Sequence, residues 1–165
     1  MSAKLLSGKD IASKIKDGLR KEIEALKSRS GAGPSLASIA VGENPASAVY
    51  MKSQSKVAQD LGIEFVSHNL PENTTEEKLI EYIEKLNKDA KTSAIILQMP
   101  LPKHIDAKKA ISFINPKKDA EGMHPENLGR LVLGKAKVAP CTPLACMELL
   151  KETGVNLYGK EVVVV

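Results

Sequence analysis

Tyr50 and Gln54 are the first residues of the chain whose types and spacing indicate a binding site. Residues four apart in a helix lie on the same face, so the two side chains would be presented together. Tyr supplies an aromatic surface and a hydroxyl, and Gln supplies a donor and an acceptor for the amide edge of a planar heterocycle. The pair therefore predicts a site for a flat, polar small molecule.

Three more polar residues are expected near this pair. Gln98 follows a strongly apolar stretch, and Asp119 and Glu121 lie in a proline-bounded loop. In an open α/β sheet the connections that leave the strand ends converge, and ligands bind there. Each residue alone has an ordinary structural interpretation, since a lone Tyr is usually a packing residue and Asp119 a turn former. Their joint placement favours a binding site.

The other reactive side chains give weaker signals. His68, His104 and His124 have no second ligand at metal spacing and are interpreted as surface or loop residues. Ser47 has no evident His/Asp relay, so a role in the first turn of a helix is favoured over that of a nucleophile. Cys141 precedes a helix N-terminus, which would lower its pKa, but a structural thiol is the favoured interpretation.

The elements that must position these residues alternate between helical and extended patterns. Helices are predicted over residues 7–29 and 46–61, and a third begins at Thr74, with Glu77 completing a capping box. Strands are predicted over residues 35–41, 63–69 and 93–99. Such alternation implies right-handed crossovers and a mainly parallel sheet. The predicted fold is a three-layer α/β/α domain.

Apolar spacing also predicts which helix faces point inward. The third helix would bury Leu79, Ile83 and Leu86, and the second would end at Gly62. The first helix has one apolar side and carries charged residues on its other face, so it is expected at the surface. That apolar side consists of Ile11, Ile15, Leu19, Ile23 and Leu26.

The pattern changes after residue 97. Residues 98–102, Gln-Met-Pro-Leu-Pro, predict a rigid strand exit, and a short helix is expected over residues 106–114. Residues 115–125 form a long polar connection of a kind that is commonly functional or disordered. Thr142 as N-cap and Pro143 as first residue predict a further helix, which would end near Gly154. The closing valine run predicts one more strand.

Composition sets broad bounds. The 165 residues are 42% apolar and 27% charged, which is ordinary for a soluble globular protein. The net charge of +4 is spread along the chain, so it argues only weakly for a nucleic-acid partner. No apolar run is long enough to span a membrane, and two cysteines make no disulfide framework. We expect a cytoplasmic protein that binds neither membrane nor nucleic acid.

Four sequence blocks resemble one enzyme family in order and spacing. The chain is similar to the bifunctional methylenetetrahydrofolate dehydrogenase/methenyltetrahydrofolate cyclohydrolase family over nearly its whole length. The blocks are Val-Gly-Glu-Asn-Pro-Ala-Ser at 41–47 with Tyr50, Gln-Met-Pro-Leu-Pro at 98–102, Lys-Asp-Ala-Glu-Gly at 118–122 and Pro-Cys-Thr-Pro at 140–143.

The resemblance implies a domain organisation and a set of ligands. Residues 1–142 would be the folate-binding catalytic domain, 143–154 a linker helix, and 155–165 the opening strand of a Rossmann domain that this chain lacks. That missing domain would bind NADP or NAD, and the active site would lie between the two domains. The expected ligands are tetrahydrofolate derivatives, and the expected partner is a second copy or a protein that supplies the missing domain.

The resemblance also assigns roles to individual residues. Tyr50 would stack on or orient the folate, Gln98 would stand beside the catalytic lysine, and Glu121 would bond the pterin edge where the family usually has Asp. Together with Gln54 at the lysine position, Tyr50 and Gln98 form the implied catalytic set. The remaining implied contacts are Met99, Pro100 and Leu101 with the substrate, and Cys141 and Thr142 with the cofactor.

Departures from the family pattern bear on activity. The family has lysine where this chain has Gln54, and a neutral amide neither titrates nor supplies a positive charge. Lys52 and Lys56 do not replace it, because two residues along a helix rotate the side chain by about 200°. Other departures are Glu121 for Asp and Ala120 and Ala145 for the more usual Val and Gly.

Three functions are therefore open. The leading hypothesis is a folate-binding domain that is impaired or inactive as an isolated chain. The second is a non-catalytic folate-binding or assembly module that keeps the family fold. A basic nucleic-acid binder ranks last, because the chain is poor in aromatic residues for stacking and has no groove-reading motif.

Overall fold

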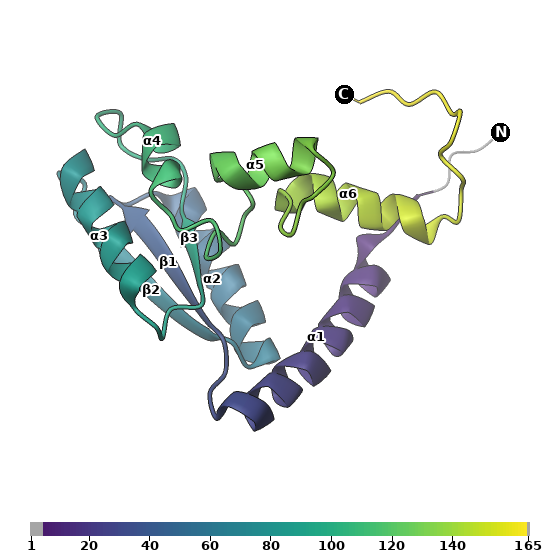
Figure 1. Cartoon of the computed structure of the whole chain (residues 1–165), viewed down its shortest axis with the longest axis horizontal. Coiled ribbons are helices and arrows are strands. Elements are labelled where there is room, and N and C mark those ends of the chain that lie inside the picture. The colour runs from purple at the N-terminus through teal and green to yellow at the C-terminus, as the bar shows by residue number, and fades with distance from the viewer. Residues whose placement is uncertain (1–4, 165) are drawn as a thin grey trace.

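A computed structural model describes residues 5–164 and shows alternating strands and helices around one sheet (Figure 1). The three strands are parallel and lie in the order β2-β1-β3. The elements in chain order are α1 (Gly8–Ser30), β1 (Ser35–Val41), α2 (Pro45–Leu61), β2 (Glu64–Leu70), α3 (Glu76–Lys88), β3 (Ala94–Leu97), α4 (Ala107–Ser112), α5 (Pro125–Val132) and α6 (Cys141–Glu152).

β1 is the central strand because it is the one that can be buried on both faces. All but one of its residues are fully buried, as is typical of a strand inside a parallel sheet. The pairing sets Ile39 beside His68 of β2 on one side and beside Leu97 of β3 on the other. The chain therefore leaves β1 toward one edge and later returns past it to the other. In open sheets, ligands bind where the strand order reverses in this way.

Helices cover both faces of the sheet, which confirms the predicted three-layer arrangement. α2 lies on one face, where Ala58 and Leu61 are buried, and α3 lies on the other (Figure 1). The inward residues predicted for α3 are buried. The core on the α3 face comprises Ala37, Ile39, Val41, Leu79, Ile83, Leu86, Ile95, Leu97, Ile105, Ala110 and Ile114.

Local sequence signals fix most helix ends. Asn44 caps α2 by accepting a hydrogen bond from the Ser47 amide at 3.1 Å, and Pro45 follows as the first helical residue. α2 ends at Gly62, as predicted. The cap of α3 is Thr75 and not Thr74, because Thr75 Oγ1 accepts from the Lys78 amide at 3.3 Å. Thr74 is instead buried in the preceding turn.

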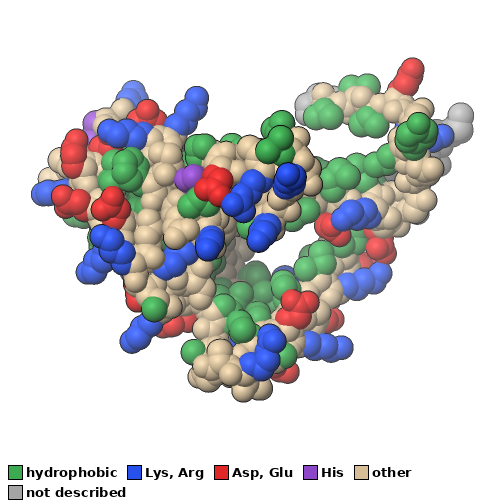
Figure 2. Space-filling model, in the orientation of Figure 1, with side chains coloured by type: hydrophobic (Ala, Val, Ile, Leu, Met, Phe, Trp, Pro, Cys, Tyr) green, Lys and Arg blue, Asp and Glu red, His purple; other side chains and the backbone are tan. Residues whose placement is uncertain are grey.

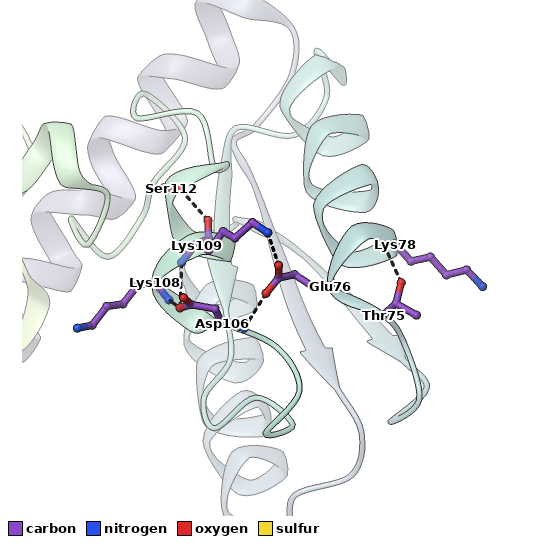
Figure 3. Close-up of polar contacts among 7 residues, drawn as sticks. All are labelled: Thr75, Glu76, Lys78, Asp106, Lys108, Lys109 and Ser112. Atoms are coloured by element: carbon purple, nitrogen blue, oxygen red, sulfur yellow. Dashed lines mark hydrogen bonds and ion pairs between the residues drawn. The ribbon is translucent and has the colours of Figure 1, made fainter.

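A carboxylate joins α3 to α4 (Figure 3). Glu76, in the first turn of α3, accepts a hydrogen bond from the Asp106 amide at 2.8 Å and forms an ion pair with Lys109. Asp106 in turn caps α4 by accepting from the Lys108 amide at 2.9 Å. The six-residue helix α4 is thereby held against α3 immediately after the proline-rich exit from β3.

The C-terminal third departs from prediction in three ways. α5 was not predicted; it begins where the His124 ring accepts from the Glu126 amide at 3.0 Å, with Pro125 as first residue. α6 begins at Cys141, so Thr142 is its second residue and not its N-cap. Residues 155–164 contain no strand, because the valine run finds no pairing partner among the described residues and Val164 is 93% exposed.

α1 and α6 lie outside the three layers. They converge with each other and are joined by an ion pair between Lys14 Nζ and Glu152 Oε1 at 2.9 Å (Figure 1). α1 lies at the surface, as predicted, and of its apolar side only Ile23 is buried. Ile15 and Leu19 are exposed because no described element covers that part of the helix. None of the helices in residues 5–164 is long and apolar enough to cross a lipid bilayer.

Candidate functional site

The turn after β1 places the start of α2 over the carboxyl end of the sheet. Gly42 donates its amide hydrogen to the Leu70 carbonyl at 2.9 Å, which ties the turn to the end of β2. Gly42 has φ of 75°, and a Cβ there would lie 3.2 Å from Glu72 Cβ. Glycine is favoured by both observations. The turn aims the first two turns of α2 across the exits of β1 and β3.

Gln54 on α2 and the buried Gln98 at the end of β3 form a partly buried amide pair. Gln98 is 6% exposed, and its Nε2 donates to Gln54 Oε1 at 2.8 Å and to Ser38 Oγ at 3.0 Å. Both hydrogens of this amide are therefore used within the protein. Gln98 Oε1 accepts no hydrogen bond from the described residues, and Gln54 Nε2 donates none to them. The pair thus offers one acceptor and one donor to a ligand.

Tyr50 lies one helical turn before Gln54 and is turned outward. Its side chain is 60% exposed, so its aromatic surface is free to stack against a planar group. It forms no hydrogen bond with the amide pair among the described residues. The sequence predicted a shared face for Tyr50 and Gln54; the structure turns Gln54 inward to Gln98 and leaves Tyr50 at the rim.

Ser47 fixes the exit from β3. Its hydroxyl donates to the Met99 carbonyl at 2.8 Å, so the first turn of α2 and the segment after β3 are joined directly. The Met99–Pro100 peptide bond is cis. This contact confirms the first-turn role that was favoured for Ser47. Pro100 lines the same cavity as Gln98, whereas Leu101 packs against the core.

A cavity of about 780 Å³ adjoins the amide pair on the β2 side. Its size falls within the range of small-molecule sites. It is bordered by the Gly42 turn, the first turn of α2, the end of β2 and the exit of β3, and Gln98 lies in its wall. Glu43 and Glu72 also line it, and within residues 5–164 no Lys or Arg does so. The cavity therefore suits a neutral or cationic group better than an anionic one.

The loop that carries Glu121 runs alongside β3. The Ala120 amide donates to the Ile95 carbonyl at 3.3 Å, and the Ile95 amide donates to the Lys118 carbonyl at 2.7 Å. Burial, and after it the Asp119 carboxylate, raises the pKa of the Glu121 carboxyl. Glu121 is half-buried near the carboxyl end of β3, but it forms no hydrogen bond with the amide pair among the described residues.

Cys141 lies against this loop at the start of α6. Its Sγ is 3.8 Å from the Ala120 carbonyl oxygen. Burial, followed by the Glu121 and Asp119 carboxylates, raises the pKa of the thiol. The lower pKa considered for a thiol before a helix N-terminus is therefore wrong here, because burial and then the two carboxylates all favour the neutral thiol. Thr142 is exposed beside it.

The histidines have structural partners. His68 shares a 2.8 Å hydrogen bond with Tyr82, His104 contacts the Thr74 carbonyl, and His124 caps α5. No group of three or more metal-ligating side chains occurs within residues 5–164. His104 and His124 lie in loops, as predicted, whereas His68 lies in β2 and is half-buried against Tyr82, so its interpretation as a loop or surface residue is wrong.

A sequence model of the tetrahydrofolate dehydrogenase/cyclohydrolase catalytic domain matches residues 6–121. That span contains Tyr50, the amide pair and Glu121. The chain belongs to the tetrahydrofolate dehydrogenase/cyclohydrolase family.

Relatives within the family are similar along the whole chain. The chain is 51% identical over 165 residues to the bifunctional protein FolD of Acetivibrio thermocellus, and it spans 58% of that relative. The bifunctional methylenetetrahydrofolate dehydrogenase/cyclohydrolase of Campylobacter jejuni shares the fold with a TM-score of 0.92 and 41% identity, over 96% of this chain and 56% of that one. The chain thus spans little more than half the length of these relatives.

A tetrahydrofolate dehydrogenase/cyclohydrolase of Trypanosoma brucei has been solved with NADP and an inhibitor. It is 36% identical to this chain with a TM-score of 0.89, over 97% of this chain and 55% of its own length. The predicted fold class and the predicted one-carbon family are thereby confirmed.

Sequence inspection missed two polar residues of this family member's site. Ser38 is fully buried in β1 and holds Gln98. A Ser in the middle of an apolar strand was an available signal, because a buried hydroxyl requires a partner. Asn127 donates a hydrogen bond to Asp119 in the loop that carries Glu121. No local sequence pattern predicts this contact, because Asp119 is eight residues away and the start of α5 lies between the two residues.

Proposed function

We propose that this domain binds a reduced folate across Tyr50, Gln54 and Gln98. The observation that carries the proposal is the partly buried amide pair, which leaves one donor and one acceptor beside an exposed aromatic ring. A pterin combines a flat ring with amide and amine edges, so it can stack on the tyrosine and exchange hydrogen bonds with the two glutamines. Met99, Pro100 and Leu101 border the ring, and Glu121 bonds its edge.

The proposed chemistry is limited by residue 54. Hydrolysis of methenyltetrahydrofolate needs a group that activates water, and the family lysine is the residue to which the resemblance assigns that role. Gln54 hydrogen-bonds but does not exchange a proton near neutral pH. We therefore expect this chain to bind folate and to turn it over slowly or not at all.

Hydride transfer would need a second domain. In a complete enzyme of this kind the nicotinamide of NADP or NAD supplies the hydride acceptor. Cys141 and Thr142 would face that cofactor, but a thiol and a hydroxyl do not form a phosphate-binding loop. Residues 5–164 contain no Gly-rich loop between a strand and a helix. The dehydrogenase activity of the longer relatives is thus proposed only for a chain joined to such a domain.

Isothermal titration of the purified chain with 5-formyltetrahydrofolate tests folate binding. We expect saturable binding that Tyr50→Ala weakens by about two- to twelvefold, because stacking on an aromatic ring contributes about 0.5–1.5 kcal/mol. Tyr158→Ala is the matched control, since Tyr158 is also exposed but lies far from the site in sequence and beyond α6. A folded chain that gives no heat of binding refutes the proposal.

The uncovered sides of α1 and α6 favour a second candidate, a module that acts by assembly. Apolar residues remain exposed on both helices, as they would if a further domain or a second copy packed there. A homodimer or a domain-supplying protein is the partner we propose for this case. Crosslinking followed by sedimentation distinguishes it from a monomeric folate binder. Cys141 and Cys146 are both free, which suits the reducing cytoplasm that we propose as its compartment.

A further inference from the structure

Asp119 is a buried carboxylate that faces hydrogen-bond donors. It is 4% exposed, and its Oδ1 accepts from the Glu121 amide at 3.2 Å. Its Oδ2 accepts from the His124 amide at 2.8 Å and from Asn127 Nδ2 at 2.8 Å. A carboxylate satisfies three donors at once, whereas an asparagine there would direct its own N–H₂ at one of them.

The rest of the loop is fixed from two further sides. Asn127 is also buried and donates a second hydrogen bond to the Pro116 carbonyl at 2.9 Å, which anchors α5 beneath the loop. Gly122 has φ of 69°, and a Cβ there would lie 2.7 Å from the Ala139 carbonyl carbon. The loop therefore has little freedom to move away from β3 or toward α6.

We propose that Asp119 is a positioning residue for Glu121: it holds the Glu121 peptide at the carboxyl end of β3, so that the Glu121 carboxyl is presented to the ligand of the neighbouring amide pair. The ligand-binding part of this inference rests on the proposed function. The positioning itself rests on the three hydrogen bonds and on the backbone contacts that place the loop beside Ile95.

The same geometry brings charges together. Asp119 accepts a hydrogen bond from the Glu121 amide, and the Cys141 Sγ lies 3.8 Å from the carbonyl oxygen of Ala120, the residue between them. The negative charge of Asp119 makes ionisation of Glu121 less favourable, and burial acts in the same direction. A variant that removes this charge while the chain stays folded should therefore change Glu121 in a measurable way, even without any ligand.

The first test needs no folate. Carbon-detected NMR of the Glu121 carboxyl and hydrogen exchange of the Glu121 amide are measured in the wild-type chain and in Asp119→Asn. We expect the variant to lower the pKa of Glu121 and to speed exchange of its amide. Asn127→Ala is the matched control: it removes one hydrogen bond to Asp119 but keeps the Asp119 charge and its bond to Glu121, so the Glu121 pKa should change less than in Asp119→Asn.

The second test is a double-mutant cycle for binding of 5-formyltetrahydrofolate. If Asp119 acts through Glu121, then Asp119→Asn weakens binding by about tenfold in the wild-type chain and has almost no effect in Glu121→Gln. If the losses of affinity caused by Asp119→Asn and Glu121→Gln multiply in the double variant, the proposal is contradicted. So would an unchanged Glu121 pKa and unchanged amide exchange in folded Asp119→Asn.

The two tests distinguish a failure of folate binding from a failure of the positioning role. A wild-type chain that fails to bind folate removes the proposed function, and the NMR arm still decides the positioning role. If Asp119→Asn does not fold, a double variant with Asp119→Asn and Asn127→Asp replaces it. In that variant the side chain at position 119 donates the hydrogen bond to position 127, whereas Asn127 donates it to Asp119 in the wild-type chain. We expect that double variant to recover the slow exchange of the Glu121 amide; rapid exchange in the folded double variant overturns the inference.

Discussion

Single residues decide what the site can do chemically. Gln54 lies where a family member is expected to carry lysine, and its Oε1 accepts a hydrogen bond from Gln98. The sequence was sufficient to name both residues and to place them at the same edge of the sheet. It was not sufficient to show their contact, because the direction of a glutamine side chain depends on Ser38, which lies 60 residues from Gln98 along the chain.

Replacing Gln54 by lysine tests the chemical account of this position. We expect Gln54→Lys to raise the rate of methenyltetrahydrofolate hydrolysis by about a hundredfold or more over the wild-type chain, since a positioned acid/base group contributes about 10²–10⁴. The loss of methenyltetrahydrofolate absorbance measures the rate. Gln54→Met is the control and should stay at the wild-type rate. An unchanged rate in a folded Gln54→Lys chain that still binds folate contradicts the account.

Glu121 gives a pH dependence of stability. Its pKa is raised from 4.5 in the folded chain by burial and by Asp119, so the folded state holds the proton more tightly than the unfolded state. The stability that protonated Glu121 contributes is therefore lost as the pH rises from the pKa of the unfolded state through the higher pKa of the folded state.

We expect Glu121→Gln to melt at a higher temperature than the wild-type chain at pH 7, because the variant has no charge to bury. Below the unfolded pKa the two chains should melt alike. Thermal unfolding followed by circular dichroism at both pH values measures the difference. A variant that is less stable at pH 7 would show that the ionised carboxylate is well solvated or paired.

Secondary-structure elements were predictable where a local pattern was sufficient. The three strands and the helices between them follow from apolar periodicity, and Gly62 marks the end of α2. α5 was missed because its start depends on His124 and Pro125, which the long polar connection obscured. The valine run after α6 has strand propensity, but a strand also needs a neighbour to pair with.

The α3–α4 connection depends on Glu76. Hydrogen bonding to Lys109, and after it the Asp106 amide, lowers the pKa of the Glu76 carboxyl from 4.5. The stabilisation is thus present above the unfolded pKa and is lost as the pH falls through the lowered folded value. We expect Glu76→Gln to lower the melting temperature at pH 7 and to have little effect at pH 3.

The effect of Glu76→Gln should be small, because Lys109 is open to solvent. Glu81→Gln is the matched control, since Glu81 is exposed on the same helix and forms no ion pair among the described residues. Equal melting temperatures for the two variants at pH 7 would mean that the connection contributes nothing measurable.

At the scale of the whole molecule, one apolar surface is left uncovered. A cavity of about 300 Å³ lies between α1 and α6 and is lined almost entirely by apolar groups such as Ile15 and Leu144. Figure 2 shows apolar side chains exposed in this region. The sequence predicted the apolar side of α1 but not that it would stay open, because coverage depends on the packing of distant segments.

Two substitutions on α1 should therefore reduce the stability of the chain to different extents. Ile23 is 7% exposed and Ile15 is 45% exposed. We expect Ile23→Ala to lower the free energy of unfolding by about 2–4 kcal/mol, because it leaves a cavity in packed surroundings. Ile15→Ser should cost much less and should reduce binding of a fluorescent apolar dye. Urea denaturation measures the first effect and dye titration the second; equal losses of stability would contradict the structure.

The central position of β1 has one further consequence. Gln98 continues the β3 ladder by donating its amide hydrogen to the Ile39 carbonyl at 2.8 Å, and Ser38 beside that contact holds its side chain. A slip of β3 by one residue against β1 would turn Gln98 toward α3 and remove the amide pair from under α2. The donor and acceptor offered to a ligand therefore exist in only one register of the sheet, so ligand binding reports on correct strand pairing as directly as any measurement of the fold.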